Sequence, residues 1–178
     1  MKLWQKDKAS LKEVEIFSIG KDREMDMYLA AFDVMGSLAH IEMLESVGLL
    51  TKDELSQLQK ELKNVFRQIK KGEFILQDDV EDIHSQVELL LTQKLGDIGK
   101  KIHSARSRND QVLVDIKLFL RNELEELVKT IQSFFELLQS QSEKYKDHLL
   151  PGYTHLQLAM PSSFGLWFGA YAESLVDD

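Results

Sequence analysis

Three polar clusters in the sequence combine acidic, basic and hydroxyl side chains in patterns suited to chemistry on a charged substrate. The first is the segment 81–84, in which Asp82 and His84 are candidates to bind or orient polar groups beside a pocket. Acidic residues also favour the first turn of a helix, because the free backbone N–H groups there attract negative charge. A capping pair followed by a surface histidine is therefore the alternative interpretation.

The second cluster, residues 103–111, concentrates hydrogen-bond donors immediately before a long segment of helical apolar periodicity. The N-terminus of a helix favours anions, and the planar guanidinium of an arginine matches the two oxygens of a carboxylate. The segment is therefore a candidate carboxylate-binding loop. A solvated basic loop with Asn109 or Asp110 as the helix cap explains the same residues, and the residue types alone do not decide between the two.

The third cluster, residues 151–157, places Thr154 beside His155. A hydroxyl next to an imidazole can share in proton transfer, although most lone histidines of this kind only satisfy a hydrogen bond. None of the five histidines has the spacing of a common metal motif. Because a glycine-rich phosphate loop is also missing from the sequence, neither a metal nor a nucleotide cofactor is expected.

Composition narrows the class of protein. The 178 residues carry a net charge of −8, which argues against a general nucleic-acid binder. The sequence has no cysteine, so it can form neither disulfides nor thiolate metal sites. The first eight residues lack the apolar core of a signal peptide, and no apolar run is long enough to span a membrane. We therefore expect a soluble, cytoplasmic protein without a membrane partner.

Helical periodicity dominates the elements that must position these clusters, and no strand pattern is convincing, so the expected fold class is all-α. The first 150 residues contain no proline. Thr51 and Glu54 form a predicted capping box, Asp78 or Asp79 is expected to cap the next helix, and residues 147–161 are expected to form a loop. Apolar residues at helical spacing predict helices over residues 26–47, 51–71, 79–95 and 109–145, and from about residue 161.

Taken in order, the three clusters resemble the argininosuccinate lyase and δ-crystallin family of the fumarase and aspartase superfamily. That family carries E-D-I/V-H, then H-T-G-R-S-R-N-D-Q, and some forty residues later P-G-Y-T-H-L-Q. This sequence has EDIH at 81–84, HSARSRNDQ at 103–111 and PGYTHLQ at 151–157. It differs from the family pattern at Ala105, Leu158 and Met160, and at Asp22, where a serine is usual.

The resemblance implies a β-elimination that splits argininosuccinate into arginine and fumarate without a cofactor. Thr154 is then expected to contact the succinyl end of the substrate, and His155 to hydrogen-bond there and assist proton transfer. The remaining expected site residues bind the substrate carboxylates or support the site: Ser107, Arg108 and Asn109 in the first role, Asp82 and His84 in the second.

The resemblance also implies a domain organisation and an assembly. Residues 1–107 are expected to form an N-terminal helical domain, and residues 108–178 the first long helices of a central bundle. The family's catalytic serine loop lies further downstream, so we expect this chain to be an N-terminal portion that is inactive alone. The family forms homotetramers in which three subunits contribute to each site. A crystallin-like member without activity and another lyase of the superfamily are the alternatives.

Overall fold

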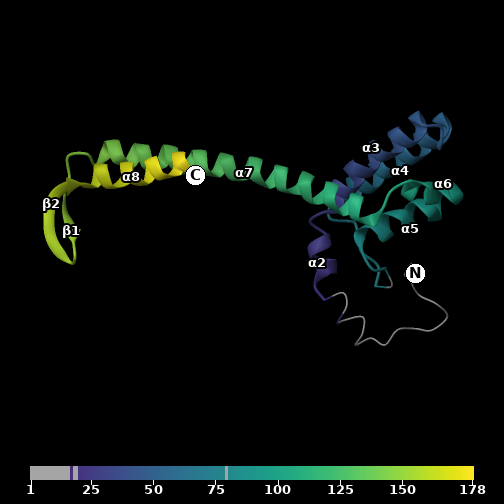
Figure 1. Ribbon diagram of the computed structural model, residues 1–178, viewed down its shortest axis with the longest axis horizontal. Helices are drawn as coiled ribbons and strands as arrows, with labels where there is room; N and C mark the ends of the chain where they lie inside the picture. Colours follow the sequence, from purple (N-terminus) through teal and green to yellow (C-terminus); the bar gives the residue numbers. More distant parts are fainter. Residues whose placement is uncertain (1–16, 18–19, 79) are drawn as a thin grey trace. The chain divides into compact units, whose positions relative to one another are not determined.

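The computed structural model describes residue 17 and residues 20–78 and 80–178. The expected all-α class is confirmed, with one small hairpin added to the helices (Figure 1). The chain divides into two compact units, Met1–Leu120 and Arg121–Asp178. The elements in order are α2 (Asp22–Asp26), α3 (Ala30–Ser46), α4 (Lys52–Lys70), α5 (Ile83–Leu95), α6 (Asp97–Lys100), the 3-10 turn η1 (Lys101–His103), α7 (Arg108–Lys144), β1 (Leu149–Thr154), β2 (Gln157–Ser163) and α8 (Phe164–Asp177).

The core of the first unit lies between α3, α4 and α5. Each of these helices buries one stripe of aliphatic side chains, as the helical spacing predicts. The residues that solvent does not reach at all include Ile41, Leu44, Leu58, Leu62, Ile83 and Leu91. Burying a side chain of this size contributes roughly 1.5–3 kcal/mol, so this core fixes α3 and α5, the two helices that flank the candidate site.

The helix ends follow the capping expectations, with one correction. Thr51 and Glu54 form the predicted capping box at α4, with reciprocal bonds of 3.2 and 2.9 Å. Helix α5 is not capped by Asp78, and Asp79, the other expected cap, lies outside the described residues. Its cap is Asp82, whose carboxylate accepts from the backbone N–H of Ser85 at 2.7 Å. The helix therefore begins four residues later than the sequence pattern predicts, and it places Asp82 at its positive end.

The second unit contains the main departure from the sequence expectations. Residues 147–161 are not a loop, because most of them belong to an antiparallel hairpin of β1 and β2. Its two turn residues, His155 and Leu156, have left-handed backbone angles (φ 50° and 61°), as tight hairpin turns require. Pro161 lies in β2 rather than at a helix start, and α8 begins at Phe164 with Ser163 as its cap.

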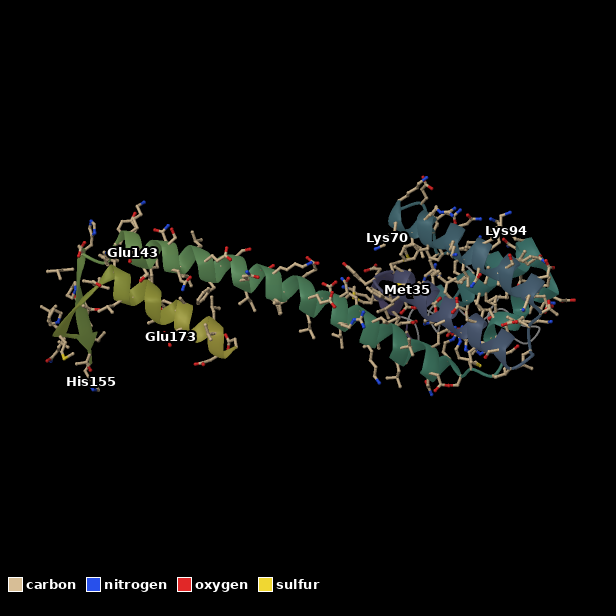
Figure 2. The ribbon with its side chains drawn as sticks, turned by 90° about the horizontal axis from the view of Figure 1, so that it is seen from above. Met35, Lys70, Lys94, Glu143, His155 and Glu173 are labelled. Atoms are coloured by element: carbon tan, nitrogen blue, oxygen red, sulfur yellow. The ribbon has the colours of Figure 1, made fainter. Side chains whose placement is uncertain are left out.

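Helix α8 packs against the end of α7 within this unit through a glycine. A Cβ placed on Gly165 would lie 2.6 Å from the Cα of Lys146. The hydroxyl of Ser142 also donates to the carbonyl of Gly165 at 2.7 Å. Figure 2 shows the side chains of α7, α8 and the hairpin, with Glu143, Glu173 and His155 labelled. None of the described helices is long and apolar enough to cross a membrane.

Candidate active site

The capping residue of α7 lies two or three residues earlier than the sequence pattern predicts. Neither Asn109 nor Asp110 is the cap. Ser107 is the cap, because its hydroxyl accepts from the N–H of Asp110 at 3.3 Å while the Asp110 carboxylate accepts from the N–H of Ser107 at 3.1 Å. Ala105, in the position of the family's glycine, has φ 55°. A side chain in this region costs roughly 1–2 kcal/mol, so the backbone of this loop is strained.

Arg108 joins the start of α7 to the start of α5. Its Nη1 donates to Oε1 of Gln111 and its Nη2 to Oγ of Ser85, both at 3.2 Å. Its Nε lies 3.7 Å from a carboxylate oxygen of Asp82. Acceptors from two helices therefore hold the guanidinium in place. Arg108 also lines a cavity of about 210 Å³. The cavity is lined by Asp22, Asp26, Glu81, Asp82, His84, Arg108 and Val112.

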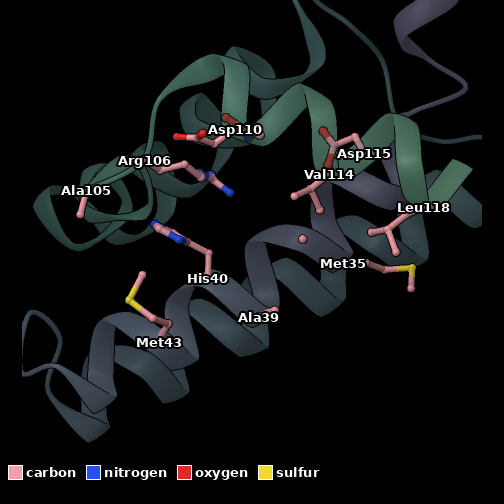
Figure 3. A pocket seen from close by; sticks show the side chains of 12 residues that line it. Met35, Ala39, His40, Met43, Ala105, Arg106, Asp110, Val114, Asp115 and Leu118 are labelled. Carbon is pink, nitrogen blue, oxygen red and sulfur yellow. The ribbon is translucent and has the colours of Figure 1, made fainter.

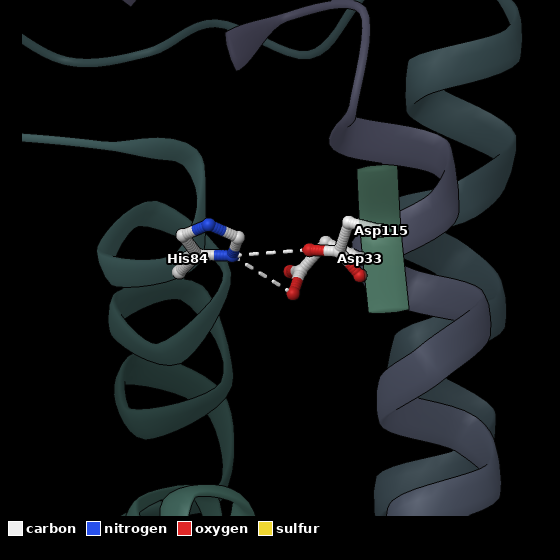
Figure 4. A group of neighbouring side chains, drawn as sticks. All are labelled: Asp33, His84 and Asp115. Carbon is white, nitrogen blue, oxygen red and sulfur yellow. Dashed lines mark hydrogen bonds and ion pairs between the residues drawn. The ribbon is translucent and has the colours of Figure 1, made fainter. Parts of the chain in front are cut away.

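His84 is buried, in contrast to the surface position that the capping interpretation implies. Its Nδ1 lies 3.0 Å from Oδ1 of Asp33 and 3.6 Å from Oδ2 of Asp115 (Figure 4). Burial by itself lowers the pKa of His84, but the hydrogen bond to Asp33 and the charge of that carboxylate outweigh burial and raise the pKa above its usual value. The contact with Asp33 therefore favours the protonated form of the ring.

Asp33 and Asp115 are two carboxylates inside the protein, each at most 1% exposed. Burial, followed by the charge of Asp33, raises the pKa of Asp115 to about 7, although His84 and Arg106 oppose the rise. Among the described residues, neither oxygen of Asp115 has a hydrogen-bond donor, and Oδ2 of Asp33 has none either. Near pH 7 Asp115 therefore carries only part of a negative charge, opposite His84 and Arg106.

These three side chains offer ligand atoms within 4.8 Å of one another, the one such group of histidines and carboxylates among the described residues. A metal ligand must be a neutral imidazole, whereas the contact with Asp33 favours the charged ring. His84 and Arg106 already balance the two carboxylates. Because Asp33 already engages Nδ1 of His84, we describe the group as a hydrogen-bonded charge cluster.

A second cavity, of about 540 Å³, lies between α3 and the segment that leads into α7 (Figure 3). Most of its wall is apolar, with Met35, Met43 and Leu118 among its residues. His40 contributes an Nε2 that lies 2.9 Å from the carbonyl of Ser104, and burial lowers the pKa of His40. Arg106 is partly buried here, and no described residue is a hydrogen-bond partner of its Nε.

The structure brings together one group of the predicted site residues. Asp82, His84 and Arg108 line one cavity, and Ser107 and Asn109 flank Arg108 in the chain, both exposed. Thr154 and His155 belong to the second unit, where they are exposed at the end of β1 and in the hairpin turn.

Sequence reasoning missed the buried partners Asp33 and Asp115 and gave Gln111 no role. Asp33 is 51 residues from His84 and 78 from Gln111, so no local motif contains the cluster. A signal was nevertheless present for Asp33, which stands in a stripe of α3 that is otherwise buried. A charged residue in such a stripe is rare unless it is paired.

Comparison with known proteins shows the family of the chain. A profile of the family described as lyase matches residues 9–178. The chain is 66% identical to an argininosuccinate lyase of Parabacteroides distasonis and 65% identical to one of Phocaeicola vulgatus, in each case over 99% of this chain and 40% of the relative. The chain thus spans about 40% of the length of these curated relatives. Among solved structures, a fumarate lyase or δ-crystallin from Brucella melitensis has the same fold, with a TM-score of 0.74 at 12% identity, over 93% of this chain and 42% of that one.

Proposed function

The chain belongs to the lyase family, and from that premise we propose that the full-length protein is an argininosuccinate lyase, which releases arginine and fumarate. The observation that supports this most directly is the guanidinium of Arg108, held by Gln111, Ser85 and Asp82 at the edge of a cavity. A positioned guanidinium at a helix N-terminus suits a substrate with several carboxylates. The relatives of 63–66% identity carry the same name.

The proposed reaction is a β-elimination. A base removes a proton from the succinyl carbon next to a carboxylate, and the resulting dianion is stabilised by preorganised donors. The bond from the neighbouring carbon to the guanidino nitrogen then breaks, arginine leaves, and fumarate remains. Ser107, Arg108 and Asn109 bind the carboxylates in this proposal, and Asp82 and His84 support them.

Thr154 and His155 take the roles at the succinyl end. Thr154 contacts the substrate, and His155 hydrogen-bonds there and assists proton transfer. Their exposure on the hairpin supports this proposal, because exposed side chains can meet groups from another subunit. We propose a cytoplasmic homotetramer in which three subunits complete each site, without metal or cofactor.

The experiment that tests the proposal follows fumarate by its ultraviolet absorbance after argininosuccinate is added to the full-length protein. Activity near a typical kcat of about 10 s⁻¹ is expected. The Arg108→Ala variant should lose roughly tenfold to a hundredfold in kcat/KM, because a charge-assisted bond is lost. Lys117→Ala, which removes an exposed cation from the same helix, is the matched control and should retain activity.

Two outcomes would contradict the proposal. A folded full-length protein that produces no fumarate would favour a crystallin-like member of the family. Turnover of aspartate, malate or adenylosuccinate instead of argininosuccinate would assign the chain to a different lyase of the superfamily.

A further inference from the structure

The side-chain amide of Gln111 has a fixed orientation in the first unit. Its Nε2 donates to Oδ1 of Asp33, while its Oε1 accepts from Nη1 of Arg108 at 3.2 Å. An ionised carboxylate can only accept hydrogen bonds. Asp33 therefore forces the nitrogen of the amide toward itself and the oxygen toward Arg108.

The same oxygen of Asp33 also holds His84. The distance from Nδ1 of His84 to Oδ1 of Asp33 is 3.0 Å, and both side chains are almost fully buried. His84 and Gln111 approach this oxygen from different helices, α5 and α7, while Asp33 itself lies on α3. One carboxylate thus links the three helices that carry or flank the arginine.

We propose that Asp33 is a positioning residue, which orients Arg108 through the amide of Gln111 and orients His84 directly. This inference rests on the proposed role of Arg108 in binding substrate carboxylates. Asp33 itself is fully buried and does not line the cavity, so it acts only through these two neighbours. Asp115, the other carboxylate near His84, contacts the ring at the longer distance of 3.6 Å and has no bond to Gln111 among the described contacts.

Replacing Asp33 by asparagine changes one oxygen acceptor into a nitrogen donor with almost no change of shape. The amide oxygen of the new asparagine is a weaker acceptor than a carboxylate, so the hydrogen bonds from Gln111 and His84 lose their charge assistance. The amide of Gln111 is then held less firmly, and Arg108 loses part of its fixed orientation. The substrate carboxylate is bound in both the ground state and the transition state, so the expected effect is on KM rather than on kcat.

The test uses the full-length protein and a double-substitution cycle. Asp33→Asn and Gln111→Met should each raise KM for argininosuccinate about tenfold, since a charge-assisted bond is lost, with a smaller change in kcat. The two substitutions together should raise KM no more than the larger single effect, because both act through the same amide.

The matched control is Val87→Ala, which weakens the core beside His84 on α5 without changing any hydrogen bond. It should lower the melting temperature as much as Asp33→Asn or more, while KM stays within about twofold. Combined with Gln111→Met, it should leave the KM effect of that substitution unchanged.

Each remaining outcome has a separate meaning. A wild-type protein without lyase activity would refute the proposed function. The fumarate affinities of the wild type, the two single variants and the double variant would then be compared by calorimetry in place of KM. An active wild type, with KM effects of Asp33→Asn and Gln111→Met that multiply, would overturn the positioning role. So would a KM effect of Val87→Ala equal to that of Asp33→Asn, because instability would then explain both.

Discussion

Asp115 shows at the scale of a single residue how a buried carboxylate couples the candidate site to pH. It lies on α7, faces Asp33 of α3 and His84 of α5, and is close to Arg106 and Asp26. Its pKa of about 7 is far above the ordinary value of 3.8 for an aspartate. A folded-state pKa above the unfolded value means that the protonated form is preferred in the folded protein. The folded state is therefore destabilised by this group as pH rises from about 4 to about 7, and the loss is constant above that range.

Asp115→Asn should remove this penalty. We expect the variant to be more stable than wild type at about pH 8, by on the order of 1–4 kcal/mol, and to have no advantage at about pH 4. The asparagine amide can donate to Oδ2 of Asp33, which has no donor in the wild type. Thermal unfolding at several pH values measures the difference.

Asp97→Asn is the control for this experiment. Asp97 is exposed, and its hydrogen bond to Lys100 lowers its pKa, so its removal should bring no gain at high pH. An Asp115→Asn variant that is equally or less stable than wild type at pH 8 would show that the carboxylate is better accommodated than its surroundings indicate.

The sequence identified candidate residues that share a cavity, but it did not identify their buried partners. Asp82, His84 and Arg108 were recognised from local motifs, and the structure places these three around one cavity. Asp33 and Asp115 could not be paired with His84, because that pairing depends on how α3, α5 and α7 pack. The place of Asp33 in a buried helix stripe is a sign of pairing but does not identify the partner.

At the scale of elements, helices were predictable where apolar periodicity is long. Helix α7 runs over Arg108–Lys144, within one residue of the expected range at each end, and the capping box at α4 is present as predicted. The hairpin was not predictable. Its strands are mostly exposed, so no alternation of apolar and polar residues marks them. Pro151, Gly152 and Pro161 are typical of turns and helix starts, and the pairing of β1 with β2 outweighs that local preference.

Substitutions at Gly165 and Gly169 of α8 can test how closely this helix must approach α7. A Cβ on Gly165 would lie 2.6 Å from the backbone of Lys146 and 2.7 Å from that of Ser142, whereas a Cβ on Gly169 meets only the hydroxyl of Ser142 at 3.4 Å. Gly165→Ala should therefore destabilise the second unit by roughly 1–3 kcal/mol, since the two backbones must separate.

Gly169→Ala is the matched control for that substitution. It should be neutral or stabilising by about 0.5–1 kcal/mol, because alanine favours the helix and meets no backbone. Unfolding by denaturant compares the two variants. Equal stabilities would show that α8 does not depend on this close contact.

At the scale of the whole molecule, many large apolar side chains of the chain are exposed. The division of the chain into its two compact units falls after Leu120, within α7. The expected domain boundary between residues 107 and 108 stays a prediction. Several large apolar side chains of the second unit are about half exposed or more. They include Leu124, Leu127, Val128, Phe134, Leu137, Leu166 and Tyr171.

We expect this surface to cause self-association of the 178-residue chain at micromolar concentration. A contiguous apolar surface on a soluble protein normally marks an interface, and each large side chain left in water forgoes roughly 1.5–3 kcal/mol. Light scattering should therefore give a mass of at least twice 20.5 kDa.

Leu127→Glu, which places a charge on an exposed apolar position of α7, should shift the chain toward monomer. Gln132→Glu adds the same charge to a polar position of the same helix and should leave the assembly intact, because no apolar contact is lost. A monomeric wild type that unfolds in one cooperative step would show that these side chains need no partner, and equal effects of the two glutamates would attribute the change to charge alone.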